Sequence, residues 1–192
     1  MPSYESIYPR TPVGTLEVKT LPARTTLVAS APGDAFNDRG AAFMKLFNYI
    51  KANQIAMSVP VAASASTNEM VFFVGARALR ASASPRENGF SSPQLMHSRT
   101  NELMHFSTLP AAGGVSVQTM PEAVVASIGL RGSYSRKAFD AGAARLAAWL
   151  ALRPQWRADG PPYAVYWNSP FVPWFLRKSE IHQPLKKLEV KR

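Results

Sequence analysis

Cysteine is absent from the 192 residues of this sequence. Without a thiol, the chain can form no disulfide, no zinc site with thiolate ligands and no covalent attachment of a c-type haem, and it lacks a cysteine nucleophile. The absence leaves the redox environment of the protein open. A haem iron would need another axial ligand, most often a histidine, and the sequence holds only three histidines.

Long uncharged apolar runs are also missing. No stretch reaches the roughly 18 to 20 residues that a membrane-spanning helix requires. The opening residues, M-P-S-Y-E-S-I-Y-P-R, contain a glutamate and two prolines and have no apolar centre, so they do not resemble a secretory signal. We therefore expect no membrane span and a soluble, cytoplasmic protein.

The common short catalytic motifs are absent as well. The chain contains no G-x-S-x-G, no G-x-x-x-x-G-K-[ST], no G-x-G-x-x-G and no H-E-x-x-H. Its histidines, His97, His105 and His182, are too scattered along the chain to suggest a metal site. An enzyme is therefore the less favoured class of protein.

Acidic side chains are outnumbered by basic ones, 12 to 22, which gives a formal net charge of +10. Such a charge favours anionic partners through a non-specific field. The basic residues are scattered from Arg10 to Arg192, and only the tail, residues 186–192, is loosely basic. Because no helix-turn-helix, zinc or RRM-type motif accompanies the charge, we expect small anionic ligands as partners rather than nucleic acid.

Two stretches of the chain resemble each other. V-K-T-L-P at residues 18–22 corresponds to V-Q-T-M-P at residues 117–121, and each is followed by a β-prone run. A helical pattern with an early phenylalanine comes next, and a proline-broken β-prone run follows it. The paired features are Phe43 with Phe139 and Pro60 with Pro170. The order predicts an internal repeat.

The length and the 46% hydrophobic content allow one core, so we predict a single domain over residues 1–192. Within it we place repeat one at about 14–75, a variable insertion at about 76–114, repeat two at about 115–185 and the basic tail at 186–192. We expect the protein to be a monomer or a weak dimer.

Hydrophobic periodicity places the helices and strands. Phe43, Leu46, Phe47 and Ile50 lie at i, i+3, i+4 and i+7, which predicts a helix from about residue 38 to residue 52. A second helix is predicted from about residue 135 to residue 150. The predicted strands and extended segments are residues 14–19, 25–29, 55–61, 69–74, 102–107, 115–120, 123–130, 163–167 and 171–184. Pro60 has no N–H and must interrupt its strand or sit at an edge.

Two motifs carry a family resemblance. I-A-M-S-V-P-V at 55–61 and N-S-P-F-V-P-W-F-L-R-K-S-E-I at 168–181 resemble the first-repeat and C-terminal motifs of the SOUL/haem-binding-protein family. The resemblance covers about Leu16 to Leu185 and implies an α+β fold, in which two pseudo-symmetric βαββ repeats form a distorted antiparallel barrel or sheet with two flanking helices. The GyrI-like effector-binding domains are similar. The implied activity is non-covalent binding of haem or a related tetrapyrrole.

The candidate ligand contacts are aromatic, apolar or basic side chains near the two motifs. Apolar contacts are expected from Phe43, Phe47, Met57, Trp174 and Phe175, and contacts to ligand carboxylates from Lys51, Arg177 and Lys178. His105 and His182 are the candidate axial haem ligands. The family motif specifies no histidine at either place, so enclosure of haem without an axial ligand stays open.

Glu180 supports an alternative hypothesis. A carboxylate in an apolar strand is costly to bury unpaired, and Arg177 or Lys178 could be its ion-pair partner. The E-I-H-Q-P sequence at 180–184 is similar to the ending of GyrI-like domains, which implies a pocket glutamate that meets cationic or polar ligands or acts as the general base of a hydrolase. A third hypothesis is a protein-interaction module that uses the basic surface and residues 81–114.

Overall fold

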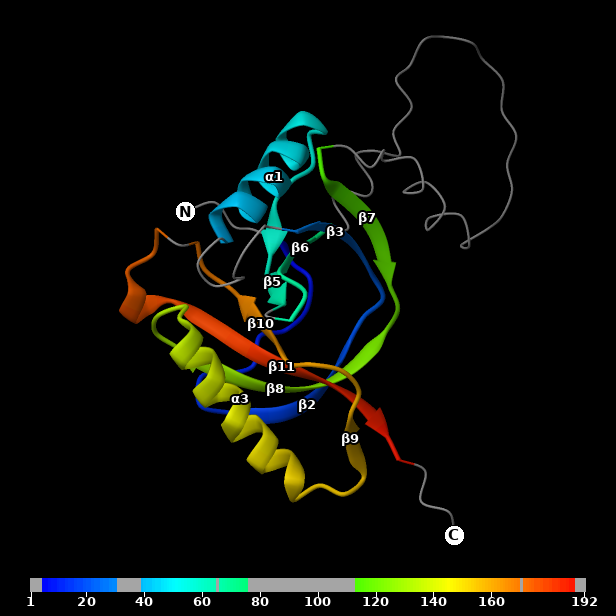
Figure 1. Cartoon of the computed structure of the whole chain (residues 1–192), viewed down its shortest axis with the longest axis vertical. Coiled ribbons are helices and arrows are strands. Elements are labelled where there is room, and N and C mark those ends of the chain that lie inside the picture. Colours follow the sequence, from blue (N-terminus) through cyan, green and yellow to red (C-terminus); the bar gives the residue numbers. More distant parts are fainter. Residues whose placement is uncertain (1–4, 31–38, 65, 76–112, 170, 189–192) are drawn as a thin grey trace, which may run out of the picture.

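The computed structural model describes residues 5–30, 39–64, 66–75, 113–169 and 171–188 (Figure 1). The strands are β1 (Glu5–Ser6), β2 (Leu16–Leu21), β3 (Arg24–Ser30), β4 (Ser58–Val59), β5 (Val61–Ser64), β6 (Glu69–Phe73), β7 (Val115–Met120), β8 (Ala123–Arg131), β9 (Trp156–Ala158), β10 (Tyr163–Tyr166) and β11 (Lys178–Lys187). The helices are α1 (Arg39–Ala52), α3 (Arg136–Ala151) and the short 3₁₀ helix η2 (Trp174–Leu176).

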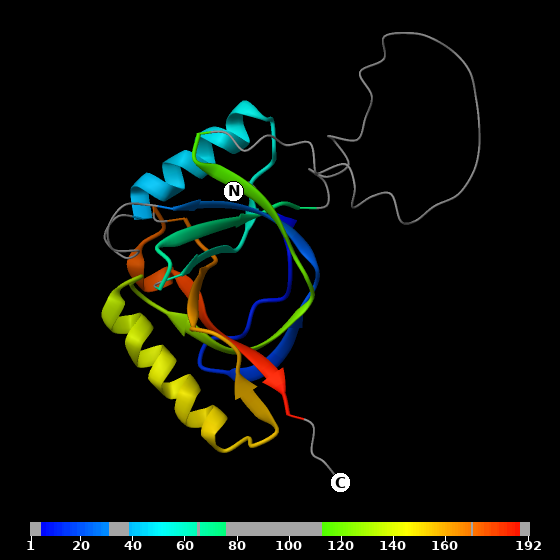
Figure 2. The same ribbon diagram turned by 45° about the vertical axis from the view of Figure 1, so that its right-hand side comes forward.

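Nine strands form one strongly curled antiparallel sheet, a half-barrel (Figures 1 and 2). Its order is β2-β8-β11-β10-β5-β6-β3-β7, with β9 paired to β11. Strands from early and late in the chain are therefore neighbours, since β2 pairs with β8 and β3 pairs with β7. The predicted α+β class with a curled antiparallel sheet and two flanking helices is confirmed. The pseudo-symmetry of two repeats stays a prediction.

Both long helices lie on the convex side of the sheet (Figure 2). Helix α1 buries Ala42, Leu46, Tyr49 and Ile50 in a cluster with residues of β3, β6 and β7. Helix α3 packs on β8 and β11, where a Cβ on Gly142 would lie only 2.9 Å from Leu130. Neither helix is long and apolar enough to cross a membrane, and no other helix among the described residues is.

The predicted boundaries agree with both long helices and most strands to within a few residues, but β1, β9 and η2 were not predicted and the predicted segment 171–184 becomes a strand only from Lys178. Two further differences concern α1 and the strand at Pro60. The apolar face of α1 is turned away from Phe47, which is partly exposed, toward Tyr49, which is buried. The predicted strand 55–61 is divided at Pro60 into β4 and β5, and β4 pairs in parallel with β1 instead of with the main sheet. The predicted strand 102–107 lies outside the described residues, as does most of the predicted insertion.

Residues 6–15, which we call the strap, run along the concave side of the half-barrel (Figure 2), where Tyr8 packs with core residues of the sheet. Val13 bridges to Gly129 of β8, whose carbonyl accepts a hydrogen bond from the Gly14 N–H at 2.8 Å. A Cβ on Gly129 would lie 2.1 Å from the Pro12 carbonyl oxygen, so only glycine permits this approach. The strap is thus held against the concave side at β8.

Candidate ligand-binding site

The segment between β10 and β11 exposes large apolar side chains. Residues 171–176, which we call the aromatic turn, include Phe171, Trp174, Phe175 and Leu176, exposed by 94%, 62%, 54% and 47%. The rings of Trp174 and Phe175 meet edge to face, with centroids 5.9 Å apart. Contiguous exposed apolar surface of this kind typically marks a binding site.

Hydrogen bonds fix the shape of the aromatic turn. The Leu176 N–H donates to the Pro173 carbonyl at 2.9 Å, and the Arg177 Nε–H donates to the Val172 carbonyl at 2.7 Å. At the base of the turn, the Tyr134 hydroxyl donates to the Lys178 carbonyl at 2.9 Å. The aromatic side chains are therefore presented by an ordered support, which lowers the entropy cost of binding.

Basic residues lie at the C-terminal end of the aromatic turn and on the strand opposite it. Lys178 is directly opposite Arg131 in the β11–β8 pair, so both side chains lie on the same face of the sheet. Like charges in directly opposite positions repel each other. The guanidinium of Arg177, the preceding residue, lies 5.5 Å from the centre of the Tyr134 ring. An anionic group bound beside these cations would relieve the repulsion.

The predicted contacts in the first half of the chain form a separate group. Phe43 stacks on Phe47 with a centroid distance of 6.0 Å, and both Phe43 and Met57 pack against the α1 cluster. Lys51 is exposed in the last turn of α1. Within the described residues, no ring contact or hydrogen bond joins this group to the aromatic turn.

Arg39 connects α1 to the second half of the chain. Its guanidinium donates to the Tyr166 hydroxyl at 3.0 Å and to the Tyr134 carbonyl at 2.6 Å, so the start of α1 is held beside the base of the aromatic turn. Arg39 could not be singled out from the sequence, because an arginine at the start of a helix normally faces solvent.

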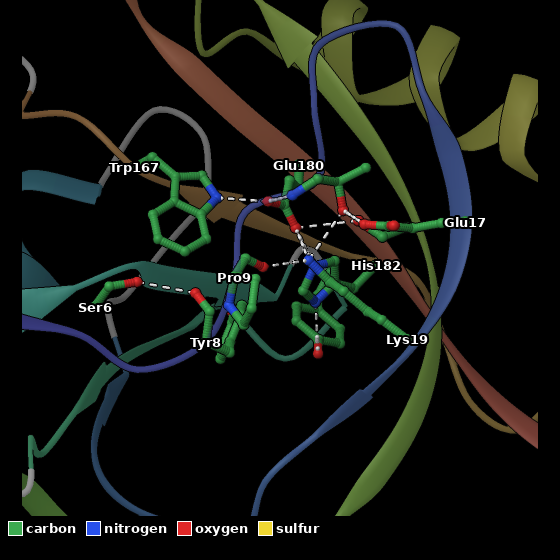
Figure 3. Close-up of polar contacts among 11 residues, drawn as sticks. Ser6, Tyr8, Pro9, Glu17, Lys19, Trp167, Glu180 and His182 are labelled. Carbon is green, nitrogen blue, oxygen red and sulfur yellow. Dashed lines mark hydrogen bonds and ion pairs between the residues drawn. The ribbon is translucent and has the colours of Figure 1, made fainter.

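Glu180 and the groups that surround it form a second polar site, on the concave side (Figure 3). The carboxylate is fully buried. It accepts hydrogen bonds from five donors, namely Lys19 Nζ at 2.6 Å, His182 Nε2 at 2.6 Å, the Thr11 N–H at 2.7 Å, Trp167 Nε1 at 2.8 Å and Ser127 Oγ at 3.0 Å. We call these six residues the Glu180 cluster. Every lone pair of the carboxylate is engaged.

The pKa values follow from this environment. Burial by itself pushes the pKa of Glu180 upward, but the hydrogen bonds and charges of His182 and Lys19 outweigh it and lower the pKa from 4.5 to about 2. Burial also lowers the pKa of His182 below 6.5, despite its contact with Glu180. At about pH 7 Glu180 is therefore ionised and His182 neutral, and Lys19 provides the compensating charge.

His182 has both ring nitrogens engaged. Because an ionised carboxylate only accepts, Nε2 carries the proton that is donated to Glu180, and Nδ1 accepts from the Tyr163 hydroxyl at 3.2 Å. In this arrangement neither nitrogen is available to a haem iron. His105 lies outside the described residues, and so does His97.

The ion-pair partner expected for Glu180 was wrong. The cation at the carboxylate is Lys19 of β2, 161 residues earlier in the chain, rather than Arg177 or Lys178. In L-E-V-K-T-L, the alternation of polar and apolar residues indicates a strand with Lys19 facing solvent. The pattern misleads here because the part of the concave face around Glu180 is both polar and buried. No local sequence signal distinguishes the two cases.

A hollow beside the first turn of α3 is too small for an organic ligand. Tyr134, Phe139 and Tyr166 are among the residues that line it, and it has room of about 10 Å³, enough for one water molecule at most. Among the described residues, no group of three histidine or acidic side chains is placed to hold a metal ion. The aromatic turn remains the candidate with enough apolar area for a flat ligand.

Comparison with known proteins adds the family. A family model described as SOUL heme-binding protein matches residues 1–184. The chain belongs to the SOUL family. No curated protein matches the chain.

Several solved structures share the fold of this SOUL-family chain but differ from it strongly in sequence. The C-terminal domain of EcmrR superposes with a TM-score of 0.58 at 12% identity, over 91% of this chain and 98% of that one. A protein described as a hydrolase from Listeria innocua superposes with a TM-score of 0.54 at 11% identity, over 92% of this chain and 94% of that one. At these identities the likeness shows a shared fold and does not extend to the activity.

Haem, the ligand implied by the SOUL family, fits the chemistry of the aromatic turn. The faces of a porphyrin are apolar and its propionates are anionic, which corresponds to Trp174 and Phe175 beside Arg177 and Lys178. The fit is poorer at the iron, since the histidine of the described residues, His182, is buried and fully hydrogen-bonded.

Proposed function

We propose that this SOUL-family protein binds haem or a related tetrapyrrole non-covalently at the aromatic turn, and so transports, buffers or senses it. The observation that carries the proposal is the exposure of four large apolar side chains on an ordered turn bordered by cations. Solvated surface of this kind is costly unless it is covered by a ligand or partner.

Apolar contact supplies most of the binding energy in this proposal. Covering about 200 Å² of the aromatic turn contributes on the order of 5 kcal/mol, at roughly 25 cal/mol per Å². Part of that energy offsets the cost of immobilising the ligand. Arg177 and Lys178 would meet the carboxylates and set the orientation of the macrocycle. Binding by enclosure requires no axial ligand. His105 stays a candidate for that role, whereas His182 could take it only by giving up its hydrogen bonds to Glu180 and Tyr163.

The predicted contacts on α1 would act as a second wall. Phe43, Phe47, Met57 and Lys51 belong to this part of the proposal, and Arg39 holds the start of α1 near the turn. Phe47→Ala tests the wall separately. A smaller loss of affinity in Phe47→Ala than in Trp174→Ala would place the macrocycle mainly on the turn.

Haemin titration followed by Soret absorption tests the proposal. We expect a saturable one-to-one shift for the native protein and a weakening of about tenfold or more in Trp174→Ala, because a stacked aromatic contact is lost. Leu152→Ala is the matched control, since Leu152 is also exposed but lies at the end of α3. No saturable shift, or equal affinity in Trp174→Ala, would overturn the proposal. A changed Soret position in His105→Ala or His182→Ala would identify an axial ligand.

The alternative, a small-molecule binder or hydrolase centred on Glu180, is less favoured by the geometry. A general base needs a pKa near the working pH and access to water. Glu180 has a pKa of about 2, and its oxygens are already engaged by five donors. Turnover of an ester or amide substrate that disappears in Glu180→Gln, with the fold retained, would restore this alternative.

A further inference from the structure

Arg24 is a buried cation at the start of β3. Only 7% of the residue is exposed. Leu27 and Ala29 of the same strand pack against α1 on the convex side, so alternation turns Arg24 to the concave side. There its guanidinium lies 5.4 Å from the centre of the Phe73 ring, within the core that also contains Tyr8.

Within the part of the chain that the structure describes, no carboxylate forms an ion pair with Arg24. Its Nη1 donates to the Pro22 carbonyl at 2.9 Å, and its Nε–H has no acceptor. Among the described residues the acidic partners in ion pairs are Glu180 and Asp140, and neither pairs with Arg24. Burying a charge without a counter-charge costs free energy, so an anion bound beside the Arg24 guanidinium would stabilise the protein.

Tyr8 of the strap supplies a second unmatched donor beside the same ring. Its side chain is 4% exposed, its ring meets Phe73 edge to face at 5.9 Å, and its hydroxyl has no hydrogen-bond partner. Burial, together with the nearby Tyr163 and Glu180, raises the pKa of Tyr8 well above 10, so the hydroxyl keeps its proton. Two buried donors from different elements thus flank one phenylalanine without an acceptor.

The neighbouring polar groups among the described residues offer no free negative charge. Glu180 already accepts from five donors, and Tyr163 is a neutral phenol whose proton is donated to His182. An oxyanion would bring the missing negative charge and at least two acceptor oxygens, one for the guanidinium and one for the phenol.

We propose that Arg24 and Tyr8 form a buried oxyanion site on the concave side of the half-barrel, which takes a carboxylate or phosphate group. The site is independent of the aromatic turn and of haem. Occupation of the site would tie the strap to β3 through Tyr8 and would therefore strengthen the closure of the concave side.

The arginine Nε–H resonances in a ¹⁵N-correlated NMR spectrum test the site directly. Acetate and inorganic phosphate are titrated separately into the full chain at constant ionic strength, and the Arg24 resonance is assigned by its loss in Arg24→Met. We expect a saturable shift of that resonance with at least one anion and a parallel rise in Tm. The anion with the lower half-saturation concentration identifies the preferred group.

Variants separate a specific site from general salt effects. Arg24→Met, which keeps the stem on Phe73, should abolish the anion-dependent rise in Tm, and Tyr8→Phe should weaken binding by about tenfold, the effect of losing one hydrogen bond to a charged group. Arg145→Met, an exposed change on α3, should leave both unchanged. Trp174→Ala should also leave them unchanged, which distinguishes this site from the haem proposal.

Three outcomes would overturn the proposal. A shift that stays linear in anion concentration, or an equal rise in Tm in Arg24→Met, would mean that only bulk salt acts. An Arg24 Nε–H resonance that does not shift with either anion would mean that ordered water accepts the hydrogen bonds of Arg24 and Tyr8 instead. A lower Tm of Arg24→Met in anion-free buffer would mean that Arg24 already has a counter-charge, since removing an unpaired buried charge should leave Tm equal or higher.

Discussion

The aromatic turn and the Glu180 cluster are close in sequence but opposite in how their side chains are satisfied. Trp174 and Phe175 are large, apolar and exposed, whereas Glu180 is charged, buried and hydrogen-bonded to five donors. A ligand gains most binding free energy where the protein exposes apolar surface or polar groups that lack partners. The difference indicates that Glu180 serves to stabilise the fold, since its hydrogen bonds are already made within the protein. The neighbouring aromatic turn leaves apolar surface exposed, and the ligand proposal rests on that surface.

Glu180→Gln should produce the largest loss of stability. The amide nitrogen that replaces one oxygen would face donors such as Lys19 Nζ or Trp167 Nε1, and a buried cation would lose its counter-charge. Breaking a buried ion pair in this way costs about 3–5 kcal/mol. Urea unfolding measures the free energy. Glu17→Gln is the matched control at the edge of the cluster, where the Glu17 carboxylate accepts from the Thr11 hydroxyl. A loss as large as that of Glu180→Gln would make the two carboxylates equivalent.

Gly129→Ala should come second, because the new methyl group would collide with the backbone of the strap. The Pro12 carbonyl lies 2.1 Å from the position of that Cβ, so the strap or β8 must shift. Overpacking of this kind costs about 1–3 kcal/mol. Gly40→Ala, in open space on α1, should instead leave stability unchanged or raise it. Equal urea midpoints for the two variants would mean that the strap is loosely held.

Acidification should destabilise the protein through His182 before it affects Glu180. His182 has a lowered pKa in the folded state, so its contribution is complete above the unfolded value of 6.5 and is lost as the pH falls below it. Between about pH 7.5 and about pH 5.5 we expect the free energy of unfolding to decrease, and the loss from Glu180 follows between 4.5 and about 2. In His182→Gln, whose amide nitrogen can replace Nε2, stability should be flat over the first interval.

Trp174→Ala should change stability least. An exposed side chain contributes little to folding, so the free energy of unfolding should stay within about 0.5 kcal/mol of the native value. The same variant should lose haemin affinity. Glu180→Gln should instead lose stability and keep its haemin affinity. A loss of stability in Trp174→Ala comparable to that in Gly129→Ala would remove the distinction between the two regions.

Much of the fold was predictable because its signals are local. The helical stripes around Leu46 and Leu146, the β-branched runs and the break at Pro60 all follow from short-range periodicity and backbone chemistry. The family motifs then supplied the curled antiparallel sheet. The aromatic turn was recognisable for the same reason, since its residues are consecutive in the sequence.

The Glu180 cluster was not predictable because its members meet only through the topology. Lys19, Thr11 and Trp167 come from distant elements, and each has an ordinary polar or aromatic role when its own neighbours alone are considered. A buried polar patch on the inner face of the sheet also reverses the usual rule that alternating polar residues face solvent. Arg24 was not predicted to be buried for the same reason, since a charged residue at the start of a strand normally faces solvent.

The hydrogen bond between the Thr11 N–H and Glu180 spans 169 residues and bears on how the protein is made. Synthesis proceeds from the N-terminal end, so the strap and β2 leave the ribosome long before β11 exists. During that time Lys19 has no counter-charge and the strap has no completed surface to lie on. Contacts of such long separation form slowly, because loop closure must precede any gain. The centre of the half-barrel, where β11 pairs with β8 and β10, is therefore completed last during synthesis. A chain released before β11 is made would lack the Glu180 carboxylate, to which the strap is hydrogen-bonded through Thr11.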